Sequence, residues 1–329
     1  MRSIYHLTFI VLILAAACKG NKGHNTTTRP GSDGLPPDPS SIAPKLDSSI
    51  VTTVANSVAF LFSGSNPIQT GVTPGAFEDR RMAVLKGRLL DSSQAPLTGV
   101  VVSLLSHPEF GSTLSRADGR FDLVVNAQGA ITLDFSKAGF LSAQRQVLSE
   151  WNHFHSVDDV VMLPVDGQVT ALVAGAPSLQ VARASVVADT DGKRQATLLI
   201  PAGTTASMTL ANGQTQSLTN LHSRATEYTQ GDNGPKAMPG TLPPTSGYTY
   251  AVEWSVDEAQ SVGATSVLFS QPAISYLENF LKFPAGTAVP IGYYDRQSGT
   301  WKADDNGRVV TLLGGWTCPT RHQWRWHSR

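Results

Sequence analysis

The fold is decided by the stretch from Leu85 to Val147, which contains Val100-Val-Val102-Ser-Leu104, Phe121-Asp-Leu123-Val-Val125 and Ile131-Thr-Leu133-Asp-Phe135. Apolar side chains recur at every second position in each run, which is the pattern of half-buried antiparallel strands. Asp118-Gly119 and Asn126-Ala-Gln-Gly129 separate the runs with residues that favour tight turns. The stretch therefore predicts four or five short strands joined by hairpins.

Several short motifs in and beside this stretch resemble the carboxypeptidase regulatory-like domain. They are Gly87-Arg-Leu89-Leu-Asp91, Pro96-Leu97-Thr-Gly99, Ser115-Arg-Ala-Asp118-Gly119-Arg-Phe121 and Phe135-Ser-Lys-Ala-Gly139-Phe140. The resemblance implies a small seven-stranded β-sandwich over residues 81–165. It also implies an accessory module without catalytic residues, grouped with the starch-binding, carbohydrate-binding-like folds.

The composition excludes partners that bind through bulk charge. The 329 residues include 25 basic and 25 acidic side chains, so nothing attracts nucleic acid by net charge. Only 15% of residues are charged, while 29 glycines and 20 prolines indicate many turns between short strands. We therefore expect an extracytoplasmic β protein that is a monomer and has no nucleic-acid partner.

Residues 1–18 are predicted to be a signal segment, with Arg2, an apolar run from Ile4 to Leu14, and small residues before Cys18. The apolar run is too short to span a bilayer. The arrangement resembles a bacterial lipoprotein signal, which implies lipidation of Cys18, a membrane anchor, and a place in the cell envelope at the outer membrane or cell surface. The alternative is an ordinary cleaved secretory peptide with a chance cysteine. Residues 19–46 are rich in Gly, Asn, Ser and Pro and are predicted to be a disordered tether.

Residues 47–80 are predicted to hold a helix and a connecting loop. Ile50, Val54, Val58 and Leu61 recur at helical spacing, which indicates a helix near 48–62. Asp47 is its expected N-cap. A strand is the alternative, because the residues from 51 to 54 are β-branched.

A second β region is predicted over residues 166–312, with strands punctuated by Asp191-Gly192, Asn212-Gly213, Ser298-Gly299 and Asn306-Gly307. The spacing Ser255-Val-Asp-Glu258 predicts a capping box and a short helix that Gly263 ends. Residues 192–204 and 292–301 resemble a ZU5-like β-sandwich. The predicted class is therefore all-β, with two successive β-sandwich domains, a short N-terminal helix and a disordered tether.

A longer series of motifs resembles the N-terminal region of bacterial RHS/YD-repeat proteins. The segments that carry it are 73–81, 107–111, 224–228, 243–250 and 292–296. In that family such a region precedes an array of repeats, and no repeat of that type occurs in this sequence.

The last residues, 313–329, form an atypical C-terminal tail that contains Trp316, Trp324, Trp326 and Cys318. One interpretation is a basic aromatic segment that binds membrane or nucleic acid. The interpretation favoured by the end of the apolar alternation is a truncated or frameshifted end that is dispensable for stability.

No catalytic motif is present, and no cofactor is expected. His153 and His155 share a strand face and could hold a metal with Asp158, but an exposed polar face is the preferred interpretation. Asp189-Thr-Asp191-Gly192 is similar to part of a calcium loop, yet Leu199 and Ile200 stand where the closing carboxylate belongs. A hairpin turn is favoured there, so no metal site is predicted.

Together these features predict a non-enzymatic, surface-anchored β-domain protein. It would be the truncated N-terminal accessory portion of an RHS/YD-repeat protein, acting as a stalk or interaction module with a protein or glycan partner. The alternative is a carbohydrate-binding module of the cell envelope. In that case Trp151 and Phe154 would form the glycan platform.

Overall fold

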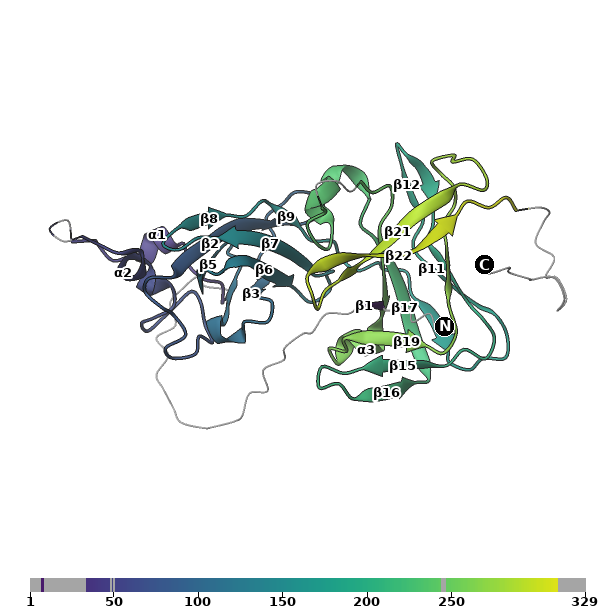
Figure 1. Cartoon of the computed structure of the whole chain (residues 1–329), viewed down its shortest axis with the longest axis horizontal. Helices are drawn as coiled ribbons and strands as arrows, with labels where there is room; N and C mark the ends of the chain where they lie inside the picture. Colours follow the sequence, from purple (N-terminus) through teal and green to yellow (C-terminus); the bar gives the residue numbers. More distant parts are fainter. Residues whose placement is uncertain (1–6, 9–33, 48, 50, 244–246, 313–329) are drawn as a thin grey trace.

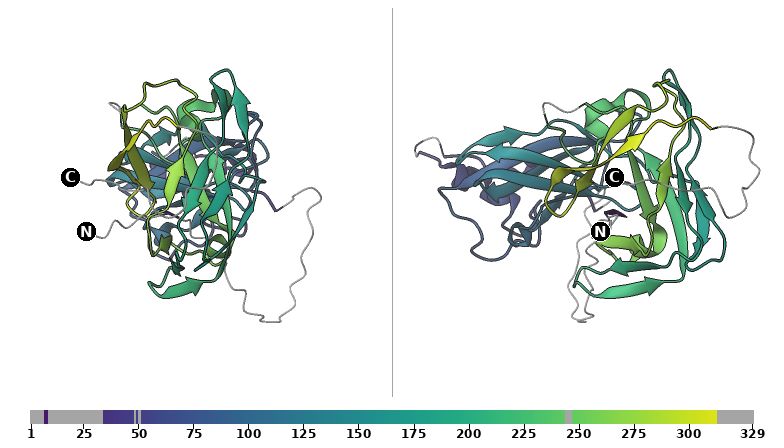
Figure 2. Two further views of the ribbon diagram at one scale, coloured as in Figure 1. Left: turned by 90° about the vertical axis from the view of Figure 1, so that its right-hand side faces the viewer. Right: turned by 45° about the vertical axis from the view of Figure 1, so that its right-hand side comes forward.

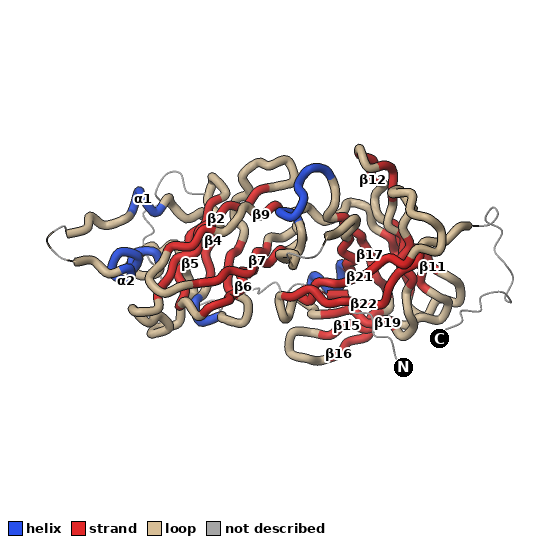
Figure 3. The backbone as a smooth tube through the Cα atoms, turned by 45° about the horizontal axis from the view of Figure 1, so that its top comes forward, coloured by secondary structure: helices blue, strands red, loops and turns tan. Residues whose placement is uncertain are grey.

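The computed structural model describes residues 7–8, 34–47, 49, 51–243 and 247–312. Two β units follow one another along the long axis of the molecule, as Figure 1 shows. Strands dominate both units, and the helical segments are short (Figure 3). The prediction of an all-β fold is therefore confirmed.

The first unit is a sandwich of two sheets. In one sheet the central strand pairs antiparallel with one neighbour and parallel with two short ones: β2 (Met82–Leu90), β5 (Arg120–Asn126), β8 (Phe154–Ser156) and β9 (Val160–Val161). The second sheet is antiparallel, in the order β4 (Ser112–Leu114), β3 (Val101–Leu104), β6 (Gly129–Ser136) and β7 (Ala143–Ser149).

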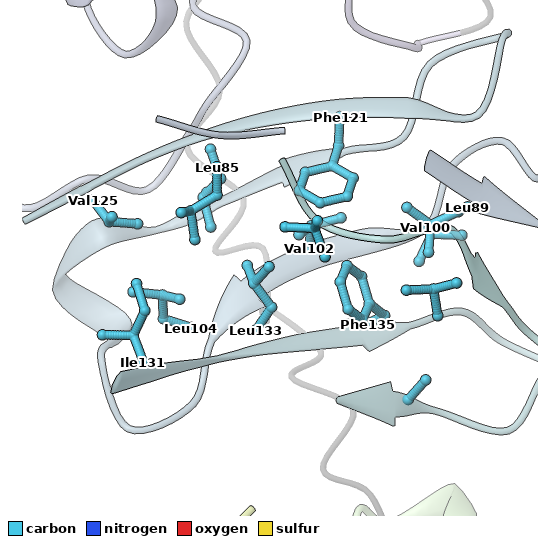
Figure 4. Packing of buried hydrophobic residues seen from close by; sticks show 14 of the residues in the cluster. Leu85, Leu89, Val100, Val102, Leu104, Phe121, Val125, Ile131, Leu133 and Phe135 are labelled. Atoms are coloured by element: carbon cyan, nitrogen blue, oxygen red, sulfur yellow. The ribbon is translucent and has the colours of Figure 1, made fainter. Parts of the chain in front are cut away.

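The apolar side chains predicted to alternate fill the space between these sheets (Figure 4). Val102 and Leu133 have no exposed surface, and Phe121 is 1% exposed. The rings of Phe121 and Phe135 meet edge to face with centroids 5.6 Å apart. A Cβ at Gly87 would lie 2.7 Å from the Phe121 ring, so the absence of a side chain there makes room for this contact.

The outer face of the β2–β5 sheet is also covered, so β5 is buried on both sides and not half-buried as predicted. The covering elements are α2 (Val54–Val58) and the 3₁₀ turn η1 (Ala59–Leu61), which pack on Val84 and Val124. The helix predicted near 48–62 is therefore real but shorter. Its N-cap is Thr53, whose side chain accepts the Asn56 N–H at 3.2 Å, and not Asp47.

A buried amide ties this cover to the sheet. Gln69 has no exposed surface; its Oε1 accepts the Val124 N–H at 2.7 Å, and its Nε2 donates to Val124 O at 2.9 Å. The side chain thus satisfies both backbone groups of Val124 as a neighbouring strand would.

The turns at Asp118-Gly119 and Asn126–Gly129 do not close hairpins, which corrects the prediction. Each connects strands of different sheets, β4 to β5 and β5 to β6. Gly119 does adopt a positive φ of 76°, and a Cβ there would lie 2.4 Å from Leu89 O. The turn residues were read correctly, but local sequence does not reveal which sheet the next strand joins.

The second unit is built from small antiparallel sheets around its own core, which includes Leu198, Leu221 and Val267. Its first sheets are β10 (Thr170–Val173), β17 (Asn220–Glu227) and β18 (Val252–Val256), and then β11 (Gln180–Arg183), β14 (Thr197–Ile200) and β20 (Ile274–Tyr276). The next is β16 (Thr215–Leu218), β15 (Ala206–Thr209), β19 (Ser266–Phe269) and β1 (Leu7–Thr8). Two ribbons complete it: β12 (Val187–Asp189) with β13 (Gly192–Arg194), and β21 (Ala288–Asp295) with β22 (Thr300–Arg308).

The remaining helical elements are short: α1 (Pro39–Ile42), η2 (Pro108–Phe110), the kinked 3₁₀ segment η3 (Gly231–Ala237) and α3 (Asp257–Ser261). The helix predicted after Ser255 is α3, and Gly263 lies just past its end with a φ of 62°. The predicted capping box is wrong, because Val256 is the N-cap. The Glu258 carboxylate instead accepts the His222 N–H at 2.9 Å. Among the described residues no helix is long and apolar enough to cross a membrane.

The central position of Phe121 makes it a direct test of the first core. Phe121→Ala should lower the free energy of unfolding by about 3–5 kcal/mol, because it leaves a cavity between the sheets. Urea denaturation of the full chain measures this loss. Phe154→Ala is the matched control, because that ring is 52% exposed. Equal losses from both substitutions would contradict the assigned core.

Candidate functional site

The most extensive buried polar cluster lies where the two units meet. Strand β7 is the edge strand of the first sandwich, and residues of the second unit cover it. In Figures 1 and 2 the β21–β22 ribbon reaches from the second unit toward β6 and β7. Consistent with this, a Cβ at Gly299, in the turn of the ribbon, would lie 3.3 Å from Thr132 of β6.

We call this contact between the two units the joint. Arg296, just after β21, lies at its centre. Its side chain is 5% exposed, and Nη1 donates to the carbonyl and the hydroxyl of Ser142, each at 3.0 Å. Its Nη2 donates to Tyr228 Oη at 2.9 Å and to Glu253 Oε2 at 3.2 Å. One guanidinium therefore binds groups of both units at once.

The charges of this pair are compatible with burial. Burial is the largest single effect and opposes the charge on Arg296. The nearby Glu253, Tyr228 and Asp134 together outweigh it and hold the pKa of Arg296 above its ordinary value. Burial also raises the pKa of Tyr228, and the adjacent Glu253 raises it further. Tyr228 is thus a neutral hydroxyl that donates to Glu253 Oε2 at 3.0 Å.

A second guanidinium crosses the joint in the opposite direction. Arg145 of β7 donates through Nη1 to Met238 O at 3.0 Å and through Nη2 to Lys236 O at 2.6 Å. Burial lowers its pKa to about 10, which still leaves it charged at neutral pH. Backbone carbonyls are neutral acceptors, so this contact fixes geometry without neutralising the charge.

Gln144 completes the cluster from the same strand. Its backbone N–H donates to Pro239 O at 2.7 Å, and Nε2 donates to Asp134 Oδ1 at 3.0 Å and to Arg296 O at 3.1 Å. Its Oε1 accepts the hydroxyl of Tyr294 at 2.9 Å. Both polar atoms of this side chain therefore make hydrogen bonds at the joint.

Close backbone approach is required beside these contacts. A Cβ at Gly240 would lie 2.2 Å from Cε2 of the Tyr294 ring. Only glycine admits the ring at that distance, so Gly240 and Tyr294 act as a pair.

The predicted glycan platform lies elsewhere, on the first unit. Trp151 is 57% exposed, and its Nε1 donates to Ala127 O at 3.1 Å, which fixes the ring orientation. Phe154 is 52% exposed, with Lys86 Nζ 4.9 Å from the ring centroid. Both rings are therefore accessible, and glycan binding stays a prediction.

The other residues singled out in the sequence have structural partners. The His153 and His155 rings lie 6.1 Å apart, and His155 Nε2 accepts the Glu150 N–H at 2.9 Å. No group of three metal-binding side chains exists among the residues that the structure places. Cys18 and the tail 313–329 lie outside the described residues.

The segment similar to a calcium loop is the turn of the β12–β13 ribbon, as the hairpin interpretation predicted. The Asp189 carboxylate receives the guanidinium of Arg194 at 2.7 and 2.8 Å. Arg194 also donates through Nε to Glu227 Oε1 at 2.8 Å. The carboxylate that resembled a calcium ligand is thus ion-paired with an arginine.

Residues 77–162 match the family model of the teneurin TTR-like domain. Teneurin-1 of Gallus gallus is 42% identical over 102 residues, which are 30% of this chain and 4% of that protein. Teneurin-3 of Mus musculus is 38% identical over 106 residues, 32% of this chain and 4% of that protein. The chain thus spans only about a twentieth of the curated relatives it matches.

Among solved structures, 3-chlorocatechol 1,2-dioxygenase from Rhodococcus opacus 1CP aligns with a TM-score of 0.24 and 12% identity. The alignment covers 30% of this chain and 64% of that one. The major pilin subunit BcpA of Bacillus cereus aligns with a TM-score of 0.20 and 11% identity over 70% of this chain and 68% of that one. Scores this low support no inference.

These matches correct the resemblances drawn from the sequence. Residues 77–162 of the first sandwich are similar to the teneurin TTR-like domain, and the expected match to bacterial RHS/YD-repeat proteins with a carboxypeptidase regulatory-like domain is wrong. The bacterial outer-membrane lipoprotein assignment loses its basis as well, because these relatives are animal proteins. The chain therefore contains a β domain related to one found in teneurins.

The joint was missed at the sequence level. Gln144 and Arg145 lie in a strand where polar residues usually face solvent, and Arg296 lies within the turn-like segment 295–299, Asp-Arg-Gln-Ser-Gly. The only available signal was the close succession of Gly292, Tyr294 and Arg296, which is too short to predict a buried contact.

Asp134 makes the joint sensitive to pH. Burial raises its pKa above the ordinary 3.8, against the opposing effects of Gln144 and Arg296. A carboxyl with a raised folded-state pKa stabilises the fold below about pH 4, and this contribution is lost as pH rises through the folded-state value. Asp134→Asn should therefore gain stability relative to the wild type as pH increases from about 4 to 7.

Urea midpoints across this pH range measure the effect, with Asp305→Asn on exposed β22 as the control. A difference between Asp134→Asn and the wild type that stays constant with pH would contradict the assignment.

Proposed function

We propose that this chain is a non-enzymatic interaction module of the cell surface that holds two β units in one fixed arrangement. The observation that carries the proposal is the joint, in which Arg145 and Arg296 bind groups of the opposite unit. The apolar segment at residues 4–14 and the turn-rich, weakly charged composition support an extracytoplasmic location.

A fixed arrangement suits a stalk or spacer. Hydrogen bonds of a buried guanidinium are directional, so they select one relative orientation of the two units. Apolar residues of both units pack beside them, including Leu141, Leu163, Tyr228 and Met238. Such a module can present a partner surface at a defined distance, because it does not bend at the connection.

Gly240→Ala tests this proposal. The added Cβ would collide with the Tyr294 ring, displace the ring and break its hydrogen bond to Gln144. We expect a loss of about 1–3 kcal/mol in stability and a larger radius of gyration in small-angle X-ray scattering, because the two units separate. Gly167→Ala is the matched control, since nothing lies within 4 Å of its Cβ.

A variant with less disturbance keeps the test informative if Gly240→Ala does not fold. Tyr294→Phe removes only the hydroxyl that donates a hydrogen bond to Gln144 Oε1. Scattering curves of both Gly240→Ala and Tyr294→Phe that match the wild type would refute a rigid joint built on these contacts.

Glycan binding at Trp151 is a second candidate function. The exposed indole, held by its hydrogen bond to Ala127 O, and the exposed ring of Phe154 support it, because exposed apolar surface marks interaction sites. A planar ring held in place loses little entropy when a sugar ring stacks on it.

Retention on insoluble polysaccharides measures this function. Trp151→Ala should abolish retention and leave the melting temperature of the fold within a few degrees, because the ring is mostly exposed. Leu148→Ala, at a side chain that is 76% exposed, should retain binding. Absence of retention of the wild type on cellulose, chitin and insoluble glucan would remove this candidate.

A further inference from the structure

An open cleft of about 750 Å³ lies beside the joint, between the two units. One wall is the loop of residues 92–94, after β2 of the first unit. The other wall is formed by residues 230–236, around η3, together with Thr226 and Glu227 of β17. Interfaces between domains are a common place for ligand sites, and this volume lies in their usual range.

Both walls of the cleft are held in place before any ligand binds. In the first wall, Asp91 Oδ1 accepts the N–H groups of Ser93 at 2.8 Å and of Ala95 at 3.0 Å. Gln94 adopts a left-handed φ of 66°, which is uncommon for a residue with a side chain. The second wall is held from behind by Arg145, whose Nη2 donates to Lys236 O.

Amide side chains bridge the two walls. Gln94 Nε2 donates to Asn233 Oδ1, and Asn233 Nδ2 donates to Ser92 O at 3.2 Å. The cleft therefore depends on the closed joint, and its width is set by contacts within the protein.

The polar lining is chemically neutral. Hydroxyls and amides predominate, as in Ser92, Thr226 and Gln230, and side chains of these types can both donate and accept. Three lining residues are charged: Asp232 and Lys236 are opposite in sign, and the Glu227 carboxylate is paired with the Arg194 guanidinium. Such a lining does not select an anion or a cation.

Glu227 adds a buried acceptor to the lining. The residue is 4% exposed, and the three side-chain hydrogen bonds that it accepts within the described chain all end on Oε1. They come from Nε and Nη2 of Arg194 and from the Thr229 hydroxyl. Oε2 accepts no hydrogen bond from the described residues, so it is available for a donor from a ligand.

We propose that this cleft binds an oligosaccharide. Sugar hydroxyls donate and accept at once, so they match the neutral lining, while Leu163 and Pro164 offer a small apolar surface for sugar C–H groups. A peptide would need a deep apolar socket for an anchoring side chain, and no aromatic residue is among the described residues that line the cleft. This site is separate from the platform at Trp151.

The test uses the full chain with two soluble probes, maltotetraose and chitotriose, titrated up to about 10 mM, which covers millimolar affinities. Calorimetry gives the dissociation constant. Hydrogen–deuterium exchange should show slower exchange in the loops around residues 92–94 and 230–236 for at least one probe. Asp232→Ala should weaken binding about tenfold or more, because a carboxylate makes strong hydrogen bonds to hydroxyls.

Two controls locate the site. Asp305→Ala makes the same change on exposed β22, and Trp151→Ala removes the other sugar candidate; both should bind as the wild type does. The proposal is overturned if neither probe binds, if exchange slows elsewhere, or if Trp151→Ala weakens binding while Asp232→Ala does not. None of these outcomes affects the rigid joint, which scattering tests separately.

Discussion

The burial of one guanidinium governs the arrangement of this molecule. Arg296 is enclosed where the two units meet, and a buried charge is tolerated only when its N–H groups find acceptors. Those acceptors belong to different units: Ser142 lies in the first, and Tyr228 and Glu253 lie in the second. Satisfying this one side chain therefore helps to fix the relative position of the two units, together with Arg145 and the apolar residues of both units that pack beside it.

The β21–β22 ribbon depends on the same contact. A two-stranded ribbon is marginally stable by itself, and most of this one faces solvent. Its end is anchored because Tyr294 fits against Gly240 and bonds to Gln144, while the turn at Gly299 lies against Thr132. A segment distant in sequence thus becomes the clamp of the first sandwich.

The sequence predicts the first core well and the joint poorly, for a physical reason. Alternation at Val102 and Leu133 records burial of one strand face, and the structure confirms it. No comparable pattern marks Gln144 or Arg145, because a polar side chain that is buried against another unit looks the same in sequence as one that faces water.

The incorrect family assignment has a related origin. Gly and Asp in turns between β-branched strands are what any small β-sandwich needs, so short motifs of that kind do not separate one sandwich family from another.

The extent of the teneurin match decides how far relatives inform function. The matched residues, 77–162, include the first core and Ser142, Gln144 and Arg145 of the joint. They end before Tyr228, Glu253, Tyr294 and Arg296. They also end before Lys236, Met238 and Pro239, whose carbonyls accept from Arg145 and Gln144, so the other half of the joint lies outside the match. Similarity to the teneurin domain therefore accounts for the sandwich but not for its attachment. A role as a rigid module rests on this chain's own contacts, because a domain of the same fold without Arg296 would lack the constraint that orients it.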